Sequence, residues 1–140
     1  MEQRFYDALQ DCPIIAAVRD EQGLEACLQS DVRVVFTLYG DVCSIAPIVD
    51  RIRAKGKLAV VHLDRVTGLA GKEVAVDFIR QATHADGVIS THPNLSQRAK
   101  GLGLFTVLRA FLIDSIALDT LIAASRIRPD AVDILPGLMP

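Results

Sequence analysis

The stretch Leu58-Ala59-Val60-Val61-His62-Leu63-Asp64 carries the pattern that decides the fold. Its apolar run leads directly into His62 and Asp64, and no polar residue interrupts the run. A strand that is buried on both faces has such a continuous Val/Ile/Leu run, which is typical of parallel sheets covered by helices. The stretch therefore predicts a buried parallel strand with polar residues at its carboxyl end.

The same pattern recurs along the whole chain. The six apolar runs are Ile14–Val18, Val32–Leu38, Leu58–Val61, Gly87–Ile89, Leu104–Leu108 and Ala131–Leu135. Helix-like stretches follow the first five runs: Gly23–Ser30, a stripe from Ile45 to Ile52, Lys72–Ala82, a helix that Asn94 would cap, and one that Asp114 or Ser115 would cap. This alternation predicts an α/β fold of repeated β/α units, with right-handed crossovers and parallel strands in sequential order. Two architectures stay open, an open six-stranded sheet or six of the eight units of a TIM-barrel-like fold.

Composition limits the class of protein. A chain of 140 residues with 51% hydrophobic residues can form one domain, residues 1–140. Its 15 basic and 17 acidic residues nearly balance, so net charge provides no general attraction to nucleic acid or to anionic membranes. No apolar stretch approaches the roughly 20 residues of a membrane helix, and Met1–Asp11 lacks the apolar core of a signal peptide. The three cysteines lack metal-ligand spacing and read as free thiols, which predicts a reducing, cytoplasmic location.

Polar residues gather where the predicted strands end, and in parallel α/β folds that edge carries the site. His62 and Asp64 could belong to a metal site, but no third ligand accompanies them, and we predict none. The pair could instead be hydrogen-bonded to each other or bind an anion or a polyol. The loop Ser90–Asn94, which contains Thr91, could hold an anion at a helix N-terminus, or Asn94 could simply cap that helix.

Two arginines, Arg19 and Arg109, follow the first and fifth predicted strands. A guanidinium group suits the bidentate capture of a carboxylate or phosphate, although a network with Asp20, Asp64 or Asp133 is an equally good interpretation. Asp133 lies between apolar neighbours, so burial would require a partner, and Arg109 on the adjacent strand is the expected one.

Basic residues also cluster weakly near two predicted helix ends, at Arg51, Arg53, Lys55 and Lys57 and at Arg126 and Arg128. Cations there suit the helix dipole, which favours a solvated surface. No aromatic stacking platform accompanies them, and an RNA-binding role does not follow from these residues.

Five strings, in this order, resemble the glycerol-uptake operon antiterminator regulatory proteins of bacteria. They are Pro13–Arg19 (PIIAAVR), His62–Asp64 (HLD), Gly87–Thr91 (GVIST), Arg109–Ser115 (RAFLIDS) and Asp133–Gly137 (DILPG). The resemblance extends from about Pro13 to Pro140. It implies a barrel-like regulator without enzymatic activity or a cofactor, which binds the effector glycerol 3-phosphate and acts on the leader RNA of glycerol-utilisation operons.

Carried over by motif, the effector pocket would be lined by Arg19, His62, Asp64, Thr91, Arg109 and Asp133. His92 stands where the family usually has Lys or Arg, and Asp133 stands where it usually has Glu. The family continues through two further β/α units, which in such barrels commonly supply the phosphate site. The resemblance thus predicts a single incomplete barrel domain over residues 1–140, with weak or no binding of glycerol 3-phosphate in this form.

Two other functions remain as alternatives. The first is a (β/α)-barrel enzyme for a small phosphorylated or carboxylated substrate, with Asp64 or Asp133 as general base and Arg109 as anion clamp. The second is a degenerate fragment without activity. If the first and last strands are sheet edges, their unpaired backbone groups also predict self-association.

Overall fold

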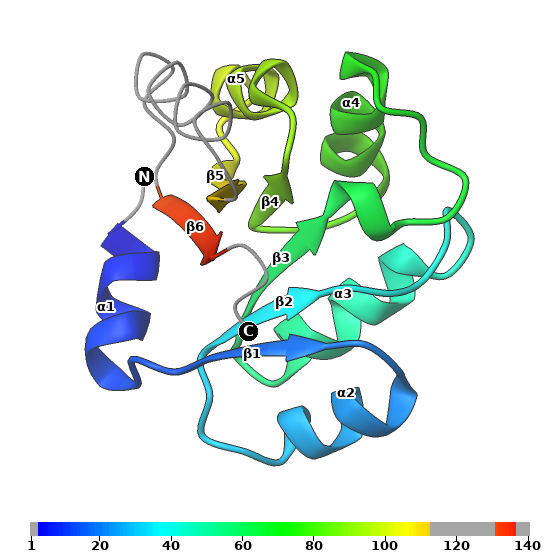
Figure 1. The fold of residues 1–140 in the computed structure, drawn as a ribbon. Coiled ribbons are helices and arrows are strands. Elements are labelled where there is room, and N and C mark those ends of the chain that lie inside the picture. Colours follow the sequence, from blue (N-terminus) through cyan, green and yellow to red (C-terminus); the bar gives the residue numbers. More distant parts are fainter. Residues whose placement is uncertain (1–2, 113–130, 137–140) are drawn as a thin grey trace.

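The computed structural model describes residues 3–112 and 131–136, which form an α/β fold with all strands parallel (Figure 1). The strands are β1 (Ile15–Val18), β2 (Val34–Thr37), β3 (Leu58–His62), β4 (Gly87–Ser90), β5 (Phe105–Leu112) and β6 (Ala131–Pro136). The helices are α1 (Gln3–Asp11), α2 (Glu21–Leu28), α3 (Ile45–Ala54), η1 (Leu63–Arg65), α4 (Glu73–Ala82) and α5 (Pro93–Gly101). The sheet order is β1-β2-β3-β4-β5-β6, which confirms the predicted sequential order.

Both faces of the central strands are buried, as the continuous apolar runs predict. Alternate residues such as Val35, Val61 and Val88 face helices α2 to α5 and form one apolar core with them. The other set forms a second core, which includes Val34, Phe36, Val60, Ile89, Phe105 and Val107. The sheet curls so that α2 to α5 lie outside it, the arrangement of a β/α arc (Figure 1).

Helix α1 covers part of the inner face, which the sequence reading of Met1–Asp11 did not predict. Phe5 and Ala8 are each 2% exposed, and the Phe5 ring stacks on Phe105 with centroids 3.7 Å apart. Gly87 on β4 makes room for this contact, because a Cβ atom there would lie 2.7 Å from the Cβ of Phe105. The short polar helix is thus held by a few apolar residues spaced along one of its faces.

Strand β5 is longer than the predicted run, which ended at Leu108. Its residues Val107 to Leu112 pair with Ala131 to Pro136 of β6, and this hydrogen-bonded neighbour extends the strand. Arg109, predicted at the strand end, therefore lies within β5, where its register partner is Asp133. The helix predicted to begin at Asp114 or Ser115 lies outside the described residues.

A buried aspartate joins the amino-terminal ends of three strands to two helices through its carboxylate and its backbone. Asp86, just before β4, accepts a 2.9 Å hydrogen bond from the backbone N–H of Ala59 on β3. Its other oxygen accepts a 2.9 Å bond from Arg4 of α1, and Nε of Arg53 on α3 lies 3.7 Å from the first oxygen. The backbone carbonyl of Asp86 accepts from Phe105 N of β5. The sequence does not single out this aspartate, because a lone Asp in a turn resembles a solvated one.

Candidate functional site

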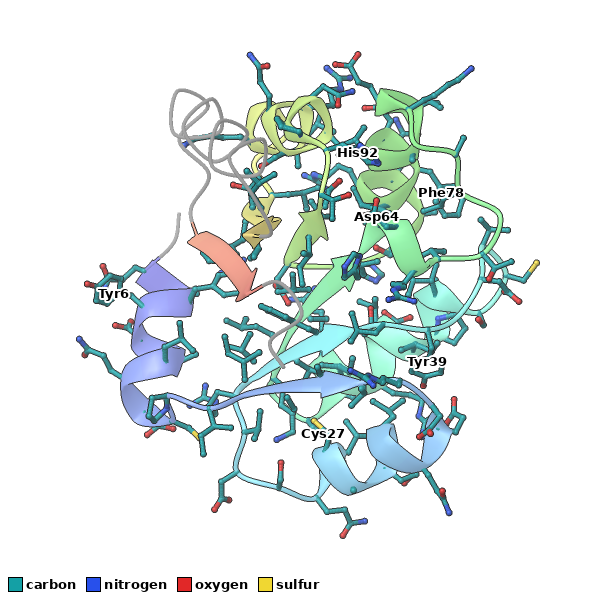
Figure 2. The ribbon with its side chains drawn as sticks, viewed as in Figure 1. Tyr6, Cys27, Tyr39, Asp64, Phe78 and His92 are labelled. Atoms are coloured by element: carbon teal, nitrogen blue, oxygen red, sulfur yellow. The ribbon has the colours of Figure 1, made fainter. Side chains whose placement is uncertain are left out.

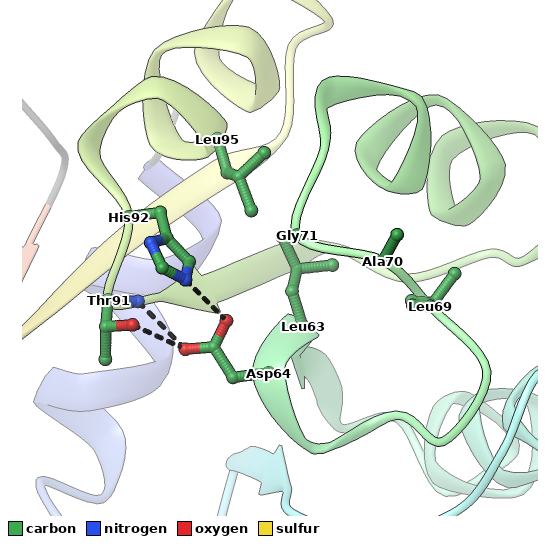
Figure 3. Close-up of a pocket in the computed structure, with 8 residues that line it drawn as sticks. All are labelled: Leu63, Asp64, Leu69, Ala70, Gly71, Thr91, His92 and Leu95. Carbon is green, nitrogen blue, oxygen red and sulfur yellow. Dashed lines mark hydrogen bonds and ion pairs between the residues drawn. The ribbon is translucent and has the colours of Figure 1, made fainter.

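The strand carboxyl ends bring two of the predicted residues into direct contact. Asp64 lies in η1 after β3, and Thr91 directly follows β4. One Asp64 oxygen accepts hydrogen bonds from the Thr91 backbone N–H at 3.1 Å and from the Thr91 hydroxyl at 2.8 Å. Nε2 of His92 lies 3.9 Å from the other oxygen, Oδ1 (Figure 3). Figure 2 places the Asp64 and His92 side chains close together at this end of the sheet.

His62 and Asp64 do not share one strand face as period-2 alternation predicts. The strand ends at His62, and the chain turns into η1. Leu63 of η1 is 4% exposed and belongs to the apolar core between the sheet and helices α2 to α5. The His62 side chain is 2% exposed, whereas the Asp64 side chain is 25% exposed. The interactions of Asp64 therefore run to the β4–α5 loop rather than back along its own strand.

The helix after β4 begins two residues earlier than capping by Asn94 would require. His92 occupies the N-cap position and Pro93 the first helical position, so Asn94 lies inside α5. Proline suits that position because it needs no N–H partner and its φ is already helical. The backbone N–H of His92 donates to the hydroxyl of Ser90 at 2.9 Å, which shapes the loop that holds Thr91.

A cavity of about 330 Å³ opens beside this carboxylate (Figure 3). Its polar side is formed by Asp64, Thr91 and His92, and its apolar side by Leu63, Leu69, Ala70 and Leu95, with Gly71 between them. The apolar side includes the loop after η1, which backbone hydrogen bonds between Thr67 and both Gly40 and Val42 tie to the neighbouring loop. Leu69 and Ala70 were not candidates from the sequence, because no local pattern shows that their loop folds back here.

The remaining candidates lie at the ends of other strands. Arg19 follows β1, is exposed, and forms no ion pair or hydrogen bond within the part of the chain that the structure describes. Its expected partner Asp20 instead caps α2, by accepting from Gly23 N at 2.7 Å. Arg109 and Asp133 lie opposite each other in neighbouring strands, so the predicted adjacency of these two positions is confirmed.

A second group of charges lies near the ends of β1 and β2. Arg51 of α3 forms a 2.7 Å ion pair with Glu21 and also contacts Glu25, and thus joins α3 to α2. The hydrogen bond from Arg51 lowers the pKa of Glu21. The Tyr39 hydroxyl donates to Glu21 at 3.3 Å. Burial raises the pKa of Tyr39 to about 12, and the negative charge of Glu21 adds to this effect.

The weak basic cluster predicted around α3 does not form one solvated surface. Lys57 is 6% exposed, and its ammonium group donates to the backbone carbonyls of Ser30 and Val32 at 2.7 and 2.6 Å. Arg51 and Arg53 point to different carboxylates, Arg51 to those of α2 and Arg53 to Asp86. Arg126 and Arg128 lie outside the described residues.

The described residues also bear on metal binding and on membrane insertion. No group of three or more His, Cys, Asp or Glu residues with metal-binding geometry occurs within residues 3–112 and 131–136. Across the same residues, no helix has the length and apolarity needed to cross a bilayer.

Comparison with known proteins places this chain in a family. The model of the glycerol-3-phosphate responsive antiterminators matches residues 14–140, a span that contains all six candidate residues. The chain belongs to this family.

Relatives of this antiterminator family are longer than the present chain. The uncharacterized protein YgcP of Escherichia coli K12 is 39% identical over 135 residues, which cover 94% of this chain and 70% of YgcP. The crystal structure of a glycerol uptake operon antiterminator regulatory protein from Listeria monocytogenes matches with a TM-score of 0.83 and 31% identity, over 90% of this chain and 69% of that one.

Two other solved structures support the same fold. An antiterminator-related protein from Thermotoga maritima gives a TM-score of 0.76 at 33% identity, over 88% of this chain and 70% of its own. The carboxyl transferase domain of Rhizobium etli pyruvate carboxylase gives 0.57 at 16% identity, over 79% of this chain and 22% of that one. At that identity the likeness concerns the fold alone. The family description is that of a regulatory antiterminator rather than an enzyme.

Proposed function

We propose that this protein is a cytoplasmic, glycerol 3-phosphate-responsive transcription antiterminator that acts on the leader RNA of glycerol-utilisation operons. The observation that carries the proposal is the family match over residues 14–140, which spans every strand of the sheet. The proposal includes no enzymatic turnover and no cofactor, with glycerol 3-phosphate as an effector ligand.

The chemistry of the effector fits the strand-end site. Glycerol 3-phosphate carries a phosphate group and two hydroxyl groups. Oδ1 of Asp64 accepts no hydrogen bond within the described residues, because Thr91 uses the other oxygen and His92 Nε2 is 3.9 Å away. In our proposal Oδ1 accepts a hydrogen bond from an effector hydroxyl, and His62 at the end of β3 belongs to the same effector site. Arg19 and Arg109 are the proposed cationic ligands of the phosphate group, since guanidinium groups bind phosphate in bidentate fashion.

The effector site can be tested by NMR titration of the ¹⁵N-labelled chain with glycerol 3-phosphate up to millimolar concentration, a range that detects weak binding. We expect amide shifts at Asp64, Thr91 and His92, and none at Gly103 on the opposite end of the sheet. Glycerol and inorganic phosphate, titrated separately, report the two halves of the ligand. Uniformly small shifts over both ends of the sheet would contradict a site at the strand carboxyl ends.

Variants then assign the roles. Asp64→Asn removes the carboxylate charge, and Arg109→Ala removes the proposed phosphate ligand and costs about 1.5–3 kcal/mol of binding free energy, the range for a charge-assisted hydrogen bond. Asp50→Asn serves as the matched control, since that carboxylate lies on α3 and pairs with His84 away from the cavity. Unchanged binding in Arg109→Ala would assign Arg109 to structure.

The proposed antitermination activity is tested with RNA. In a run-off transcription assay with a glycerol-operon leader and terminator, adding the chain with glycerol 3-phosphate should raise full-length transcript, and adding either alone should not. Effector and RNA should also increase each other's affinity by the same factor, because coupling between sites is reciprocal. Read-through that is independent of glycerol 3-phosphate would contradict the proposed response.

Self-association through the sheet edges belongs to the same proposal. Among the described residues β1 and β6 are the edge strands, and Ile14 and Ile15 at the start of β1 are 64% and 39% exposed. An unpaired strand edge with apolar neighbours invites pairing with a second copy.

A further inference from the structure

Three arginines from three different helices meet around one cavity at the amino-terminal ends of the strands. Arg4 comes from α1, Arg53 from the last turn of α3 and Arg80 from the last turn of α4. They line a cavity of about 240 Å³ together with Thr83 and His84. Arg53 lies shortly before β3 and Arg80 shortly before β4, and Arg4 pairs with Asp86 at the start of β4. The cavity therefore lies at the end of the sheet opposite to Asp64 and Thr91.

The protein itself anchors each guanidinium group and leaves part of it to solvent. Arg80 donates through Nε to the carbonyl of Leu102 at 3.3 Å, and it is exposed. Arg4 uses one terminal nitrogen for Asp86 while its side chain is 58% exposed, and Arg53 donates through Nη1 to the carbonyl of His84 at 3.0 Å. A guanidinium group has five N–H donors, so each arginine keeps donors for a ligand, and its backbone or carboxylate anchor limits its rotation.

The local charge favours an anion. Asp86 is the one carboxylate among the described residues that line the cavity, and its side chain is 3% exposed. Three guanidinium groups thus face one buried carboxylate, while the chain as a whole has a formal net charge of −2. The excess of positive charge is therefore a local feature of this cavity and not a property of the chain as a whole. Among the described residues that line it there is no Phe, Tyr or Trp, so this part of the cavity offers contacts to phosphate and no platform on which bases could stack.

We infer that this cavity, formed by Arg4, Arg53 and Arg80, is a contact surface for the phosphodiester backbone of RNA. The inference rests on the proposed antiterminator function and adds to it where the RNA binds. The effector and the RNA then occupy opposite ends of the sheet, so both are bound at once rather than competing for one anion site. Backbone contact of this kind holds and positions RNA, whereas sequence recognition lies elsewhere on the protein.

The test measures the salt dependence of RNA binding by fluorescence anisotropy, with a labelled glycerol-operon leader RNA and a labelled uridine 20-mer. For single-stranded nucleic acid each phosphate contact contributes a slope of about −0.7 to log K against log salt concentration. Arg80→Gln should reduce the steepness of this slope by about 0.7 for both probes. If the variant and the unmodified chain bind equally at 1 M salt, the variant then binds about fivefold more weakly at 0.1 M salt. Arg80→Lys keeps the charge and should restore the slope.

Arg51→Gln is the matched control. It removes the same charge from the same helix as Arg53, but Arg51 pairs with Glu21 and Glu25 near the other end of the sheet. Its slope should stay that of the unmodified chain. Arg80 is preferred to Arg4 and Arg53 as the test position because it does not contact the buried carboxylate of Asp86, and circular dichroism confirms that each variant is folded.

The outcomes separate the two proposals. Binding of the unmodified chain with an unchanged slope in Arg80→Gln would overturn the RNA surface and leave the antiterminator function standing. Failure of the unmodified chain to bind leader RNA would overturn both. Displacement of RNA by millimolar glycerol 3-phosphate in the unmodified chain but not in Arg80→Gln would show a site for small phosphates instead. Equal binding of polyglutamate at the same salt concentration would indicate an acidic protein partner, and would likewise overturn the inference.

Discussion

Asp86→Ala tests whether the buried carboxylate holds the amino-terminal ends of the strands together. The substitution removes the acceptor of the Ala59 N–H, which donates at 2.9 Å from a residue that is fully buried. A buried donor that loses its acceptor costs about 1–3 kcal/mol. The ion pairs with Arg4 and Arg53 add less, since those side chains are 58% and 42% exposed and each such pair contributes about 0–1 kcal/mol.

We therefore expect Asp86→Ala to lower the free energy of unfolding by about 2–4 kcal/mol, a large share of the 5–15 kcal/mol typical of a domain. Equilibrium urea denaturation followed by circular dichroism measures this loss, and an unchanged m-value would show that the folded state stays compact. Asp86→Asn keeps one oxygen for Ala59 and should fall between the alanine variant and the unmodified chain.

Asp50→Ala is the control, because it removes an exposed carboxylate whose 3.0 Å partner is the ring of His84. That variant should change the unfolding free energy by about 0.5 kcal/mol or less, as is usual for surface positions. A loss below about 1 kcal/mol in Asp86→Ala would refute the reasoning, since an unsatisfied buried N–H of Ala59 could not cost so little.

Three further predictions concern the inner core, a tyrosine and the sheet edge. Phe5→Ala should cost about 3–5 kcal/mol in urea denaturation, because the ring is 2% exposed and stacks on Phe105, and a cost under about 1 kcal/mol would mean that α1 contributes little to the fold. Absorbance titration of Tyr39, taken as the difference from Tyr39→Phe, should give a pKa near 12 that falls in Glu21→Gln. Because the folded-state pKa of Tyr39 is raised, the stability it contributes is present below its unfolded pKa of about 10 and should be lost as the pH rises towards 12, whereas Tyr39→Phe should lack that loss. Sedimentation velocity over a concentration series should show self-association that Ile14→Lys reduces, and a monomer at every concentration would contradict pairing through the β1 edge.

The predicted strands could be located from the sequence because each is a short apolar run with clear ends. Leu58–Val61 became β3 with one residue added, and Gly87–Ile89 became β4 in the same way. Helix α1 could not be located, because its stabilising contact is the stacking of Phe5 on Phe105, a residue one hundred positions away. A leucine and an alanine within one turn of a polar segment are too few to predict a helix from the sequence. Contacts with the sheet provide the remaining stabilisation of the helix.

Part of the site was also predictable. Arg19, His62, Asp64, Thr91 and Arg109 were chosen because each follows or ends an apolar run, and parallel strands bring such positions to one edge. Asp133 lies inside the sixth run and was added through its family motif and its expected pairing with Arg109. The partners of those residues were less predictable. Asp64 accepts hydrogen bonds from Thr91, and a turn into η1 ends the strand alternation on which the predicted pairing of Asp64 with His62 rested.

The sequence by itself therefore determined the type and order of the strands, since a continuous apolar run has one favourable environment, a sheet buried on both faces. It also indicated that Arg19, Asp64 and Thr91 follow strands β1, β3 and β4, whereas Arg109 and Asp133 lie inside β5 and β6 in the structure. Tertiary structure alone decided which charges meet across long separations in the chain: Arg4 reaches Asp86, and Arg53 and Arg80 join it from two other helices around one cavity. Charge pairing depends on distances of a few ångström between residues that the sequence leaves far apart, and only the packed sheet fixes those distances.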